Sequence, residues 1–304
     1  MKKVGLALGG GSARGVAHIG VIKALKEANI PIHCIAGTSA GAIVGGVYVA
    51  GDLDKLEKEL LDMTWQKTIR FFDVAFPKKG FFNGNKIYDF IDRLLIKKTF
   101  KGLKTQFCAV AVEAHTGKEV QIKEGKVADG IRASMSLPGI FTPVERKGVH
   151  LVDGGVVNPV PVNAVRKMGA DIVIAVDLNH HFDTTPIQLP KKKNSKTPFT
   201  FLEQMKVKYK ESSWMMRRHI NKWLKANSPM IVDVLNSTIN IMQNQITQKN
   251  FITDPADIVI QPKLGSIGLF DFYYAQWMIN EGYKTMKKEI PKLKKQIELE
   301  ELKT

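Results

Sequence analysis

A serine between small residues is the group in this chain best suited to chemistry. Residues 37–41 read Gly-Thr-Ser-Ala-Gly, with Ser39 at the centre. Glycines on both sides of a serine are typical of a sharp strand-to-helix turn, which holds the hydroxyl clear at the start of a helix. The pattern therefore predicts Ser39 as a nucleophile, although the same string also fits an ordinary turn before a helix. The predicted elbow consists of Gly37, Thr38, Ala40 and Gly41.

A glycine-rich loop lies upstream of this serine, where residues 9–15 read Gly-Gly-Gly-Ser-Ala-Arg-Gly. Such a loop can aim backbone N–H groups, reinforced by a helix dipole, at an anion or a developing oxyanion. Arg14 could bind a lipid phosphate or hold the loop in shape by donating to its carbonyls, and we favour the second role. The predicted oxyanion hole consists of Gly9, Gly10, Gly11, Ser12, Arg14 and Gly15.

The same loop has some likeness to the Gly-x-Gly-x-x-Gly fingerprint of dinucleotide-binding folds. In that register the third glycine would fall at position 14, where the chain has Arg14. The second strand also ends at Gly37 and Thr38 instead of an acidic residue that could bind a ribose. Both departures argue against a nucleotide site.

A distal carboxylate could activate the serine. Asp153 follows the apolar pair Leu151 and Val152, and its acid loop continues with Gly154 and Gly155. A serine hydroxyl is a weak nucleophile until a neighbouring group accepts its proton, and a carboxylate within hydrogen-bond reach can do so. Asp153 is therefore the candidate base, although Asp-Gly-Gly is also typical of a surface turn.

A histidine would complete a three-residue site only if its position suited that role. In α/β-hydrolases the histidine follows both the serine and the acid, which leaves three of the seven histidines. His180 and His181 end an apolar run, and His219 lies in a basic helical stretch, so their contexts suit catalysis poorly. His18, beside the glycine loop, is expected to pack or to cap.

Alternating apolar runs and helical patterns must position these residues. The glycine loop and the elbow each join a strand-like run to the helical pattern that follows it. A hairpin is expected within residues 110–122, turning at His115, Thr116 and Gly117. The alternation predicts a three-layer α/β/α fold with a mainly parallel central sheet. The strand-like runs are 4–8, 30–36, 107–112 and 172–178, and the helical patterns 16–28 and 40–50.

Taken together and in this order, the motifs resemble those of the patatin-like phospholipases. The signature of that family is a glycine-rich loop with a basic residue, a Gly-x-Ser-x-Gly elbow and a distal Asp-Gly-[Ala/Gly], which residues 9–15, 37–41 and 153–155 match. Residues 17–21 and 133–143 are similar to the small bacterial members of the family. The likeness extends over residues 1–180 and, more loosely, over a stretch near 257–272.

The resemblance implies a serine acyl hydrolase that acts on a phospholipid or a lysophospholipid. In its terms Ser39 is the nucleophile, and Asp153 is the sole catalytic partner and general base. The amides around Gly10, Gly11 and Ser12 would stabilise the tetrahedral oxyanion, and no histidine, metal or cofactor is required. The alternative is a catalytically weak lipid-binding or regulatory protein of the same fold, which the intact Ser39 and Asp153 disfavour.

A formal charge of +16 over 304 residues favours contact with polyanions or with anionic membrane faces. The sequence has no zinc-ligand cluster and no motif that reads DNA or RNA, so no nucleic-acid partner is expected. An anionic membrane surface suits an acyl hydrolase better. The lysines could equally serve only to keep the protein surface soluble.

The basic residues concentrate in a stretch that looks inserted. Residues 199–246 form a long helical pattern with apolar side chains among lysines and arginines. This pattern could be a lid, a helix at the lipid surface or a helical pair packed on the core. We therefore divide the chain into a catalytic core (1–180), a basic helical insertion or cap (181–256), and a C-terminal strand and helices that complete the core (257–304).

Two further segments bear on the site and on the C-terminus. The aromatic run 71–82 could line an acyl pocket near the serine or belong to the core. Residues 284–304 alternate lysine and glutamate in a helical pattern that Pro291 interrupts, which predicts a solvated helix.

The N-terminal Met-Lys-Lys mimics the start of a secretory signal, but the apolar run after it is short and is itself the first strand. No stretch approaches the ~18 apolar residues of a membrane span. Cys34 and Cys108 lie in apolar runs and are expected to be buried free thiols of a reducing compartment. We expect a cytoplasmic protein, peripheral at the membrane, with a secreted effector that lacks a cleavable signal as the alternative.

Overall fold

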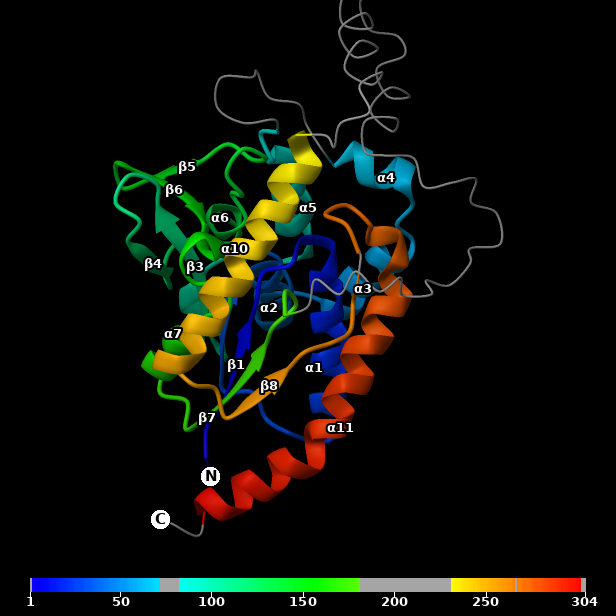
Figure 1. Ribbon diagram of the computed structural model, residues 1–304, viewed down its shortest axis with the longest axis vertical. Helices are drawn as coiled ribbons and strands as arrows, with labels where there is room; N and C mark the ends of the chain where they lie inside the picture. Colours follow the sequence, from blue (N-terminus) through cyan, green and yellow to red (C-terminus); the bar gives the residue numbers. More distant parts are fainter. Residues whose placement is uncertain (1, 72–81, 181–230, 266, 302–304) are drawn as a thin grey trace, which may run out of the picture.

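Eight strands form one sheet in the computed structural model, which describes residues 2–71, 82–180, 231–265 and 267–301 (Figure 1). Their order is β5-β6-β3-β2-β1-β7-β8, and β4 pairs with β3. The pairs from β3 through β2, β1 and β7 to β8 are parallel, whereas β4, β5 and β6 pair antiparallel. The strands are β1 (Val4–Leu8), β2 (Cys34–Thr38), β3 (Gln106–Glu113), β4 (Glu119–Ile122), β5 (Val144–Arg146), β6 (Val149–Asp153), β7 (Ile172–Val176) and β8 (Ile258–Ile260).

The central parallel strands are buried on both faces, since every residue of β1, β2 and β7 is buried. Parallel neighbours need a crossover connection, and here helices supply it and cover the sheet. Within the described residues, the helices and 3-10 turns are η1 (Ser12–Val16), α1 (Ala17–Glu27), α2 (Ala40–Ala50), α3 (Leu53–Leu61), α4 (Trp65–Arg70), α5 (Asn85–Leu94), η2 (Phe100–Gly102), α6 (Val127–Ser134), η3 (Gly154–Val156), α7 (Val162–Lys167), α10 (Ile231–Thr253), η4 (Phe272–Tyr274) and α11 (Ala275–Glu301).

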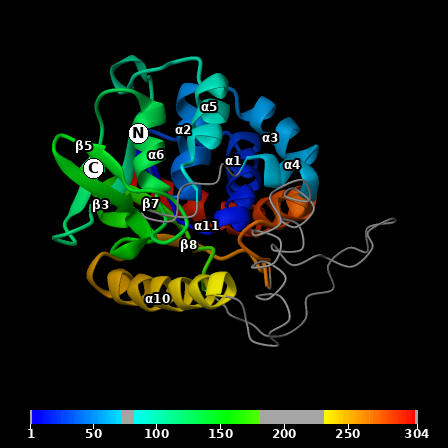
Figure 2. The same cartoon turned by 90° about the horizontal axis from the view of Figure 1, so that it is seen from above.

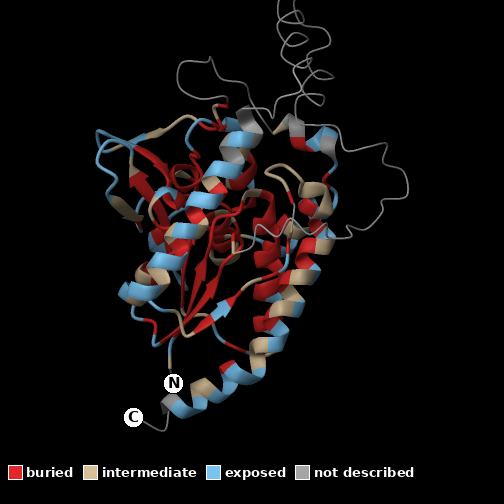
Figure 3. Cartoon of the chain, viewed as in Figure 1, coloured by how far each residue is buried: buried red, intermediate tan, exposed pale blue. Residues whose placement is uncertain are grey.

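The helices form a layer on each face of the sheet. Figure 2 shows the sheet between α10 on one side and α1, α2, α5 and α6 on the other. Two apolar clusters fill the space between layers, a large one beneath α1, α2 and α11 and a smaller one beneath α7. Buried residues accordingly gather along the sheet and the inner helix faces (Figure 3). The predicted three-layer α/β/α fold with a mainly parallel sheet is confirmed.

Two local expectations can be compared directly with the structure. The β3 and β4 strands form the expected antiparallel hairpin, in which Gly117 adopts φ of 71° and donates its N–H to the Glu113 carbonyl at 2.9 Å. Cys34 and Cys108 are buried free thiols, and burial raises their pKa values to about 11 and about 12. Both thiols are therefore protonated and unreactive at neutral pH.

The C-terminal helix differs from the expectation. Pro291 does not interrupt it, because α11 is continuous from Ala275 to Glu301 with the proline inside. Met286 and Leu293, on either side of the proline, are fully buried, so packing holds both flanks in place. Figure 1 shows the last turns of α11 bending away from its first part, as a proline within a helix predicts. The helix is thus part of the core and not only a solvated tail.

The basic insertion is described only from residue 231 onward. Residues 181–230, with the helical pattern from 199 and with His181 and His219, lie outside the described residues. The remaining part forms α10, which packs against η3 and buries Asn240, Gln243 and Thr247. None of the described helices combines the length and the hydropathy that crossing a bilayer requires.

The contact between α1 and α11 depends on the absence of side chains. A methyl group at Gly20 would overlap the Ile279 carbonyl, and one at Gly282 would overlap the Ala17 carbonyl. We expect Gly20→Ala to destabilise the protein by about 1–3 kcal/mol, because the helices must separate to admit the methyl. The urea midpoint measures this, with Gly102→Ala as control, whose methyl would meet nothing closer than 3.8 Å. Equal midpoints for the two variants would contradict the close packing.

Candidate active site

The sheet register places the glycine loop beside Ser39. Leu8 pairs with Gly37 in the parallel β1–β2 ladder, so the two chains leave the sheet at the same level. A methyl group added at Gly10 would lie 3.4 Å from Ser39 Cβ. Because carboxyl ends of neighbouring parallel strands meet at one edge of the sheet, the loop faces the hydroxyl-bearing residue directly.

Ser39 forms the turn between β2 and α2. Its φ of 56° and ψ of −121° lie in a region that residues other than glycine rarely adopt. The first turn of α2 presses on β1, since a methyl group at Gly41 would overlap the Leu8 carbonyl. The glycine after the serine is therefore required by the close approach of helix and strand, and the surrounding packing holds Ser39 in its strained conformation.

Asp153 reaches the same level from the other side of β3. This strand lies between β2 and β6, with Thr38 opposite Val110 and Asp153 opposite Ala111. Ser39, one residue beyond Thr38, therefore stands level with Asp153 across a single strand. The two residues are brought together by strand register, although 113 positions separate them in the sequence.

Asp153 is a fully buried carboxyl group. Its Oδ1 accepts the Gly155 N–H at 2.8 Å. Its Oδ2 has no hydrogen-bond partner at bonding distance among the described residues, although the Ser39 side chain lies near enough to lower the pKa of the carboxyl. Burial outweighs both of these contacts and raises the pKa of Asp153 to about 6. At neutral pH the group is thus ionised and more basic than an exposed aspartate, as a general base should be.

The glycine loop offers fewer free amides than the sequence predicts. The Gly10 N–H donates to the Pro159 carbonyl at 3.0 Å, so it already has an acceptor. No acceptor lies at bonding distance of the Gly11 or Ser12 N–H within the described residues. Ser12 has φ of 52°, a strained conformation that turns the chain at this point. Within the described residues, the Gly11 and Ser12 N–H groups are thus without an acceptor, whereas the Gly10 N–H is already bonded; the oxyanion hole itself stays a prediction.

Arg14 is buried and bonds to the protein. Its Nε donates to the Gly11 carbonyl at 3.4 Å, and its Nη2 donates to Asn240 Oδ1 of α10 at 2.8 Å. Burial lowers the pKa of Arg14 to about 10, opposed by the charge of Asp177, so the guanidinium remains charged. These contacts join the buried guanidinium to the glycine loop and to α10, and thereby help to hold the loop in shape.

His18 and Asn179 bind the carbonyls of the same loop. Burial lowers the pKa of His18 to about 4, so the neutral ring donates from Nε2 to the Gly9 carbonyl at 2.8 Å. Asn179 Nδ2 lies 3.4 Å from the Gly10 carbonyl and donates to Gln243 Oε1 of α10 at 2.9 Å. The loop is thus fixed by α1, by the end of β7 and by α10.

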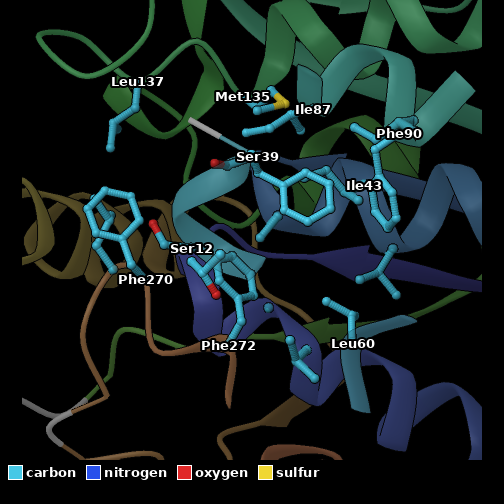
Figure 4. A pocket seen from close by; sticks show the side chains of 18 of the residues that line it. Ser12, Ser39, Ile43, Leu60, Ile87, Phe90, Met135, Leu137, Phe270 and Phe272 are labelled. Carbon is cyan, nitrogen blue, oxygen red and sulfur yellow. The ribbon is translucent and has the colours of Figure 1, made fainter. Parts of the chain in front are cut away.

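An apolar cavity of about 130 Å³ opens beside Ser39. Figure 4 shows Ser12 and Ser39 on its wall among aromatic and aliphatic side chains of α2, α5 and η4. From the aromatic run 71–82, Phe71 lines the cavity and packs edge-on against Phe90 at 4.9 Å, Phe82 is buried in the core, and residues 72–81 lie outside the described part. The lining also includes Ile43, Ile87, Leu137, Phe270 and Phe272.

Several residues at the site are not predicted from the sequence, among them Ser134, Asn179, Asn240 and Gln243. The Ser39 N–H donates to Ser134 Oγ of α6 at 3.0 Å, and Asn240 and Gln243 reach the site from α10. Ser134 lies in the segment 133–143, whose only signal in the sequence is its likeness to the family. The α10 residues carry no local signal, because only the tertiary structure brings them to the loop.

More than half of the chain matches a known protein family. The family described as "Patatin-like phospholipase" matches residues 6–166 of the chain. This range is more than half of the 304 residues and contains the glycine loop, the elbow and Asp153 with its acid loop.

Similar proteins come from bacteria and fungi. An uncharacterised NTE family protein of Mycobacterium bovis is 40% identical over 177 residues, which are 58% of this chain and 49% of that protein. Lysophospholipase nte1 of Neurospora crassa is 26% identical over 303 residues, which are 97% of this chain and 19% of that protein. The crystal structure of VipD from Legionella pneumophila aligns with 96% of this chain and 67% of its own, at 12% identity and a TM-score of 0.47. The chain thus spans half or less of the length of the curated relatives.

Proposed function

Because the chain belongs to the patatin-like phospholipase family, we propose that it is a serine acyl hydrolase that cleaves phospholipids or lysophospholipids. One observation carries the proposal: Ser39, in a strained turn, stands level with the buried carboxyl of Asp153 beside an apolar cavity. The fungal relatives are named lysophospholipases, which favours a substrate with a single acyl chain.

In the proposed reaction Ser39 attacks the ester carbonyl while Asp153 accepts the hydroxyl proton. The N–H groups of Gly11 and Ser12 stabilise the charge on the carbonyl oxygen in the tetrahedral intermediate. Asp153 returns the proton to the departing alcohol, and the carbonyl reforms as an acyl-enzyme. Water then repeats the sequence under the same base and releases the fatty acid. The apolar cavity would hold the acyl chain.

We further propose that the enzyme works at an anionic membrane surface as a cytoplasmic, peripheral protein, with secretion as an effector as the alternative. The formal charge of +16 supports this, since anionic lipids attract a basic protein. The proposed division into a core (1–180), a basic insertion (181–256) and a C-terminal part that completes the core (257–304) is retained, with α10 and β8 packed against the core.

The proposed function is tested by release of free fatty acid from anionic lysophospholipid and phospholipid vesicles and by hydrolysis of a short-chain nitrophenyl ester, without added metal. Wild-type protein should hydrolyse both the lipid vesicles and the nitrophenyl ester. A paired His180→Ala/His181→Ala variant should keep that turnover, because the proposed base is Asp153. Wild-type protein that is silent on every substrate but binds the vesicles would favour the lipid-binding alternative.

The pH dependence of the reaction should report the Asp153 carboxyl. Its pKa is raised to about 6, and only the ionised form can accept the serine proton. We expect kcat/KM to be constant above that pH and to fall about tenfold per pH unit below it. A pH series of nitrophenyl ester hydrolysis measures this. A midpoint that disappears in the paired histidine variant would assign the titration to a histidine instead.

A further inference from the structure

The carboxyl end of α6 touches both residues of the proposed dyad. Ser134 Oγ accepts the Ser39 N–H at 3.0 Å and donates to the Val110 carbonyl of β3 at 2.6 Å. Two residues further on, the Ser136 carbonyl accepts the Asp153 N–H at 2.9 Å. One tripeptide, residues 134–136, therefore holds the backbones of nucleophile and base.

The bond from Ser134 meets a specific need of the elbow. Ser39 is the N-cap of α2, and the first N–H groups of a helix have no acceptor within the helix. The positive φ of Ser39 turns its amide toward α6, and Ser134 is fully buried, so water does not replace the hydroxyl. Because the single Ser134 proton is donated to Val110, the hydroxyl oxygen must present a lone pair to Ser39. The Val110 carbonyl of β3 therefore fixes the direction of the hydrogen bond between Ser39 and Ser134, in which the Ser39 N–H is the donor.

The tripeptide is itself held rigidly. Ser136 Oγ donates to the Arg132 carbonyl at 2.9 Å and accepts from Arg132 Nη1 at 2.7 Å, which ties it to the last turn of α6. The α6 helix packs in turn on β3 and β6, the strands whose register sets the level of the dyad. In addition to the strand register, one short, bonded segment thus holds the backbones of Ser39 and Asp153 in place.

We propose that Ser134 is a positioning residue for the reaction, which fixes the strained Ser39 backbone so that its hydroxyl faces Asp153. The inference rests on the proposed hydrolase function. In this role Ser134 does not contact the substrate. Loss of the Ser134 hydroxyl should therefore impair the chemical step and leave substrate binding unchanged.

The test is Ser134→Ala, assayed with the nitrophenyl ester. Titration with a fluorophosphonate, which labels reactive serines, counts the active sites, so that kcat refers to correctly folded molecules only. We expect kcat per active site to fall about tenfold or more, with KM within about twofold of wild type. The control is Thr285→Ala, which removes a half-buried hydroxyl that donates to a carbonyl within α11 at 2.8 Å, and which should keep the wild-type kcat.

The outcomes separate the inference from the function. Wild-type protein without turnover or serine labelling would remove the proposed function, whereas active wild type with an unchanged kcat per site in Ser134→Ala would overturn the positioning role alone. A variant that loses only titratable sites, with kcat per site intact, would show that Ser134 serves stability and would also overturn it. If the alanine variant does not fold, Ser134→Cys, which keeps the size but is a weaker acceptor, should show an intermediate loss in the same assay.

Discussion

Ser39→Ala should lower fatty-acid release by at least about 10³-fold, because the acyl group then has no nucleophile to receive it. The substitution removes one oxygen and keeps the Ser39 N–H bond to Ser134, so the urea midpoint should remain close to wild type. Vesicle binding should also persist, since the cavity wall loses no apolar atom.

This prediction is checked by vesicle hydrolysis and vesicle sedimentation on the same preparations. Ser237→Ala, an exposed serine of α10, is the matched control and should hydrolyse at the wild-type rate. If Ser39→Ala retained most of the turnover, another group would be the nucleophile and the elbow would be only a structural turn.

Asp153→Asn should lower turnover by about 10³-fold and, at the same time, make the protein more stable at neutral pH. An amide cannot accept the serine proton, so the activity is lost. The stability gain follows from burial, which raises the pKa of Asp153 from 3.8 to about 6. In the unfolded chain the carboxyl ionises at lower pH, so wild-type stability falls as the pH rises from the unfolded to the folded pKa and then stays reduced.

The asparagine variant lacks this ionisation, and its carbonyl oxygen can still accept the Gly155 N–H. The difference in unfolding free energy should vanish below about pH 4 and approach about 3 kcal/mol above pH 6. Urea midpoints of both proteins across this range measure it, with Asp54→Asn, an exposed carboxyl, as control. A variant that is less stable than wild type at every pH would contradict the conclusion that burial destabilises the ionised Asp153.

The parts of the site that the sequence could predict are those encoded locally. The elbow around Ser39 and the glycine loop can be predicted because tight turns and close backbone approaches require small residues at a few neighbouring positions. The parallel sheet can be predicted because strands that are buried on both faces are apolar throughout. In each case a short window of sequence contains the physical cause.

The remainder depends on partners that lie far apart in the chain. Nothing near Gly10 indicates that the Pro159 carbonyl accepts its N–H, and nothing near Arg14 points to Asn240. At Pro291 the local sequence predicts an interruption that does not occur. A proline usually ends or breaks a helix, but here the burial of Met286 and Leu293 on either side keeps α11 continuous.

The bonds from α10 to the glycine loop have a consequence for any shortened form of the protein. A fragment of residues 6–166 would keep every signature by which the family is recognised. It would nevertheless lose Asn240, the amide that receives the buried guanidinium of Arg14, as well as strand β8 and the helix that covers α1. The part of the chain that the family match covers is therefore smaller than the part whose residues hold the glycine loop in place.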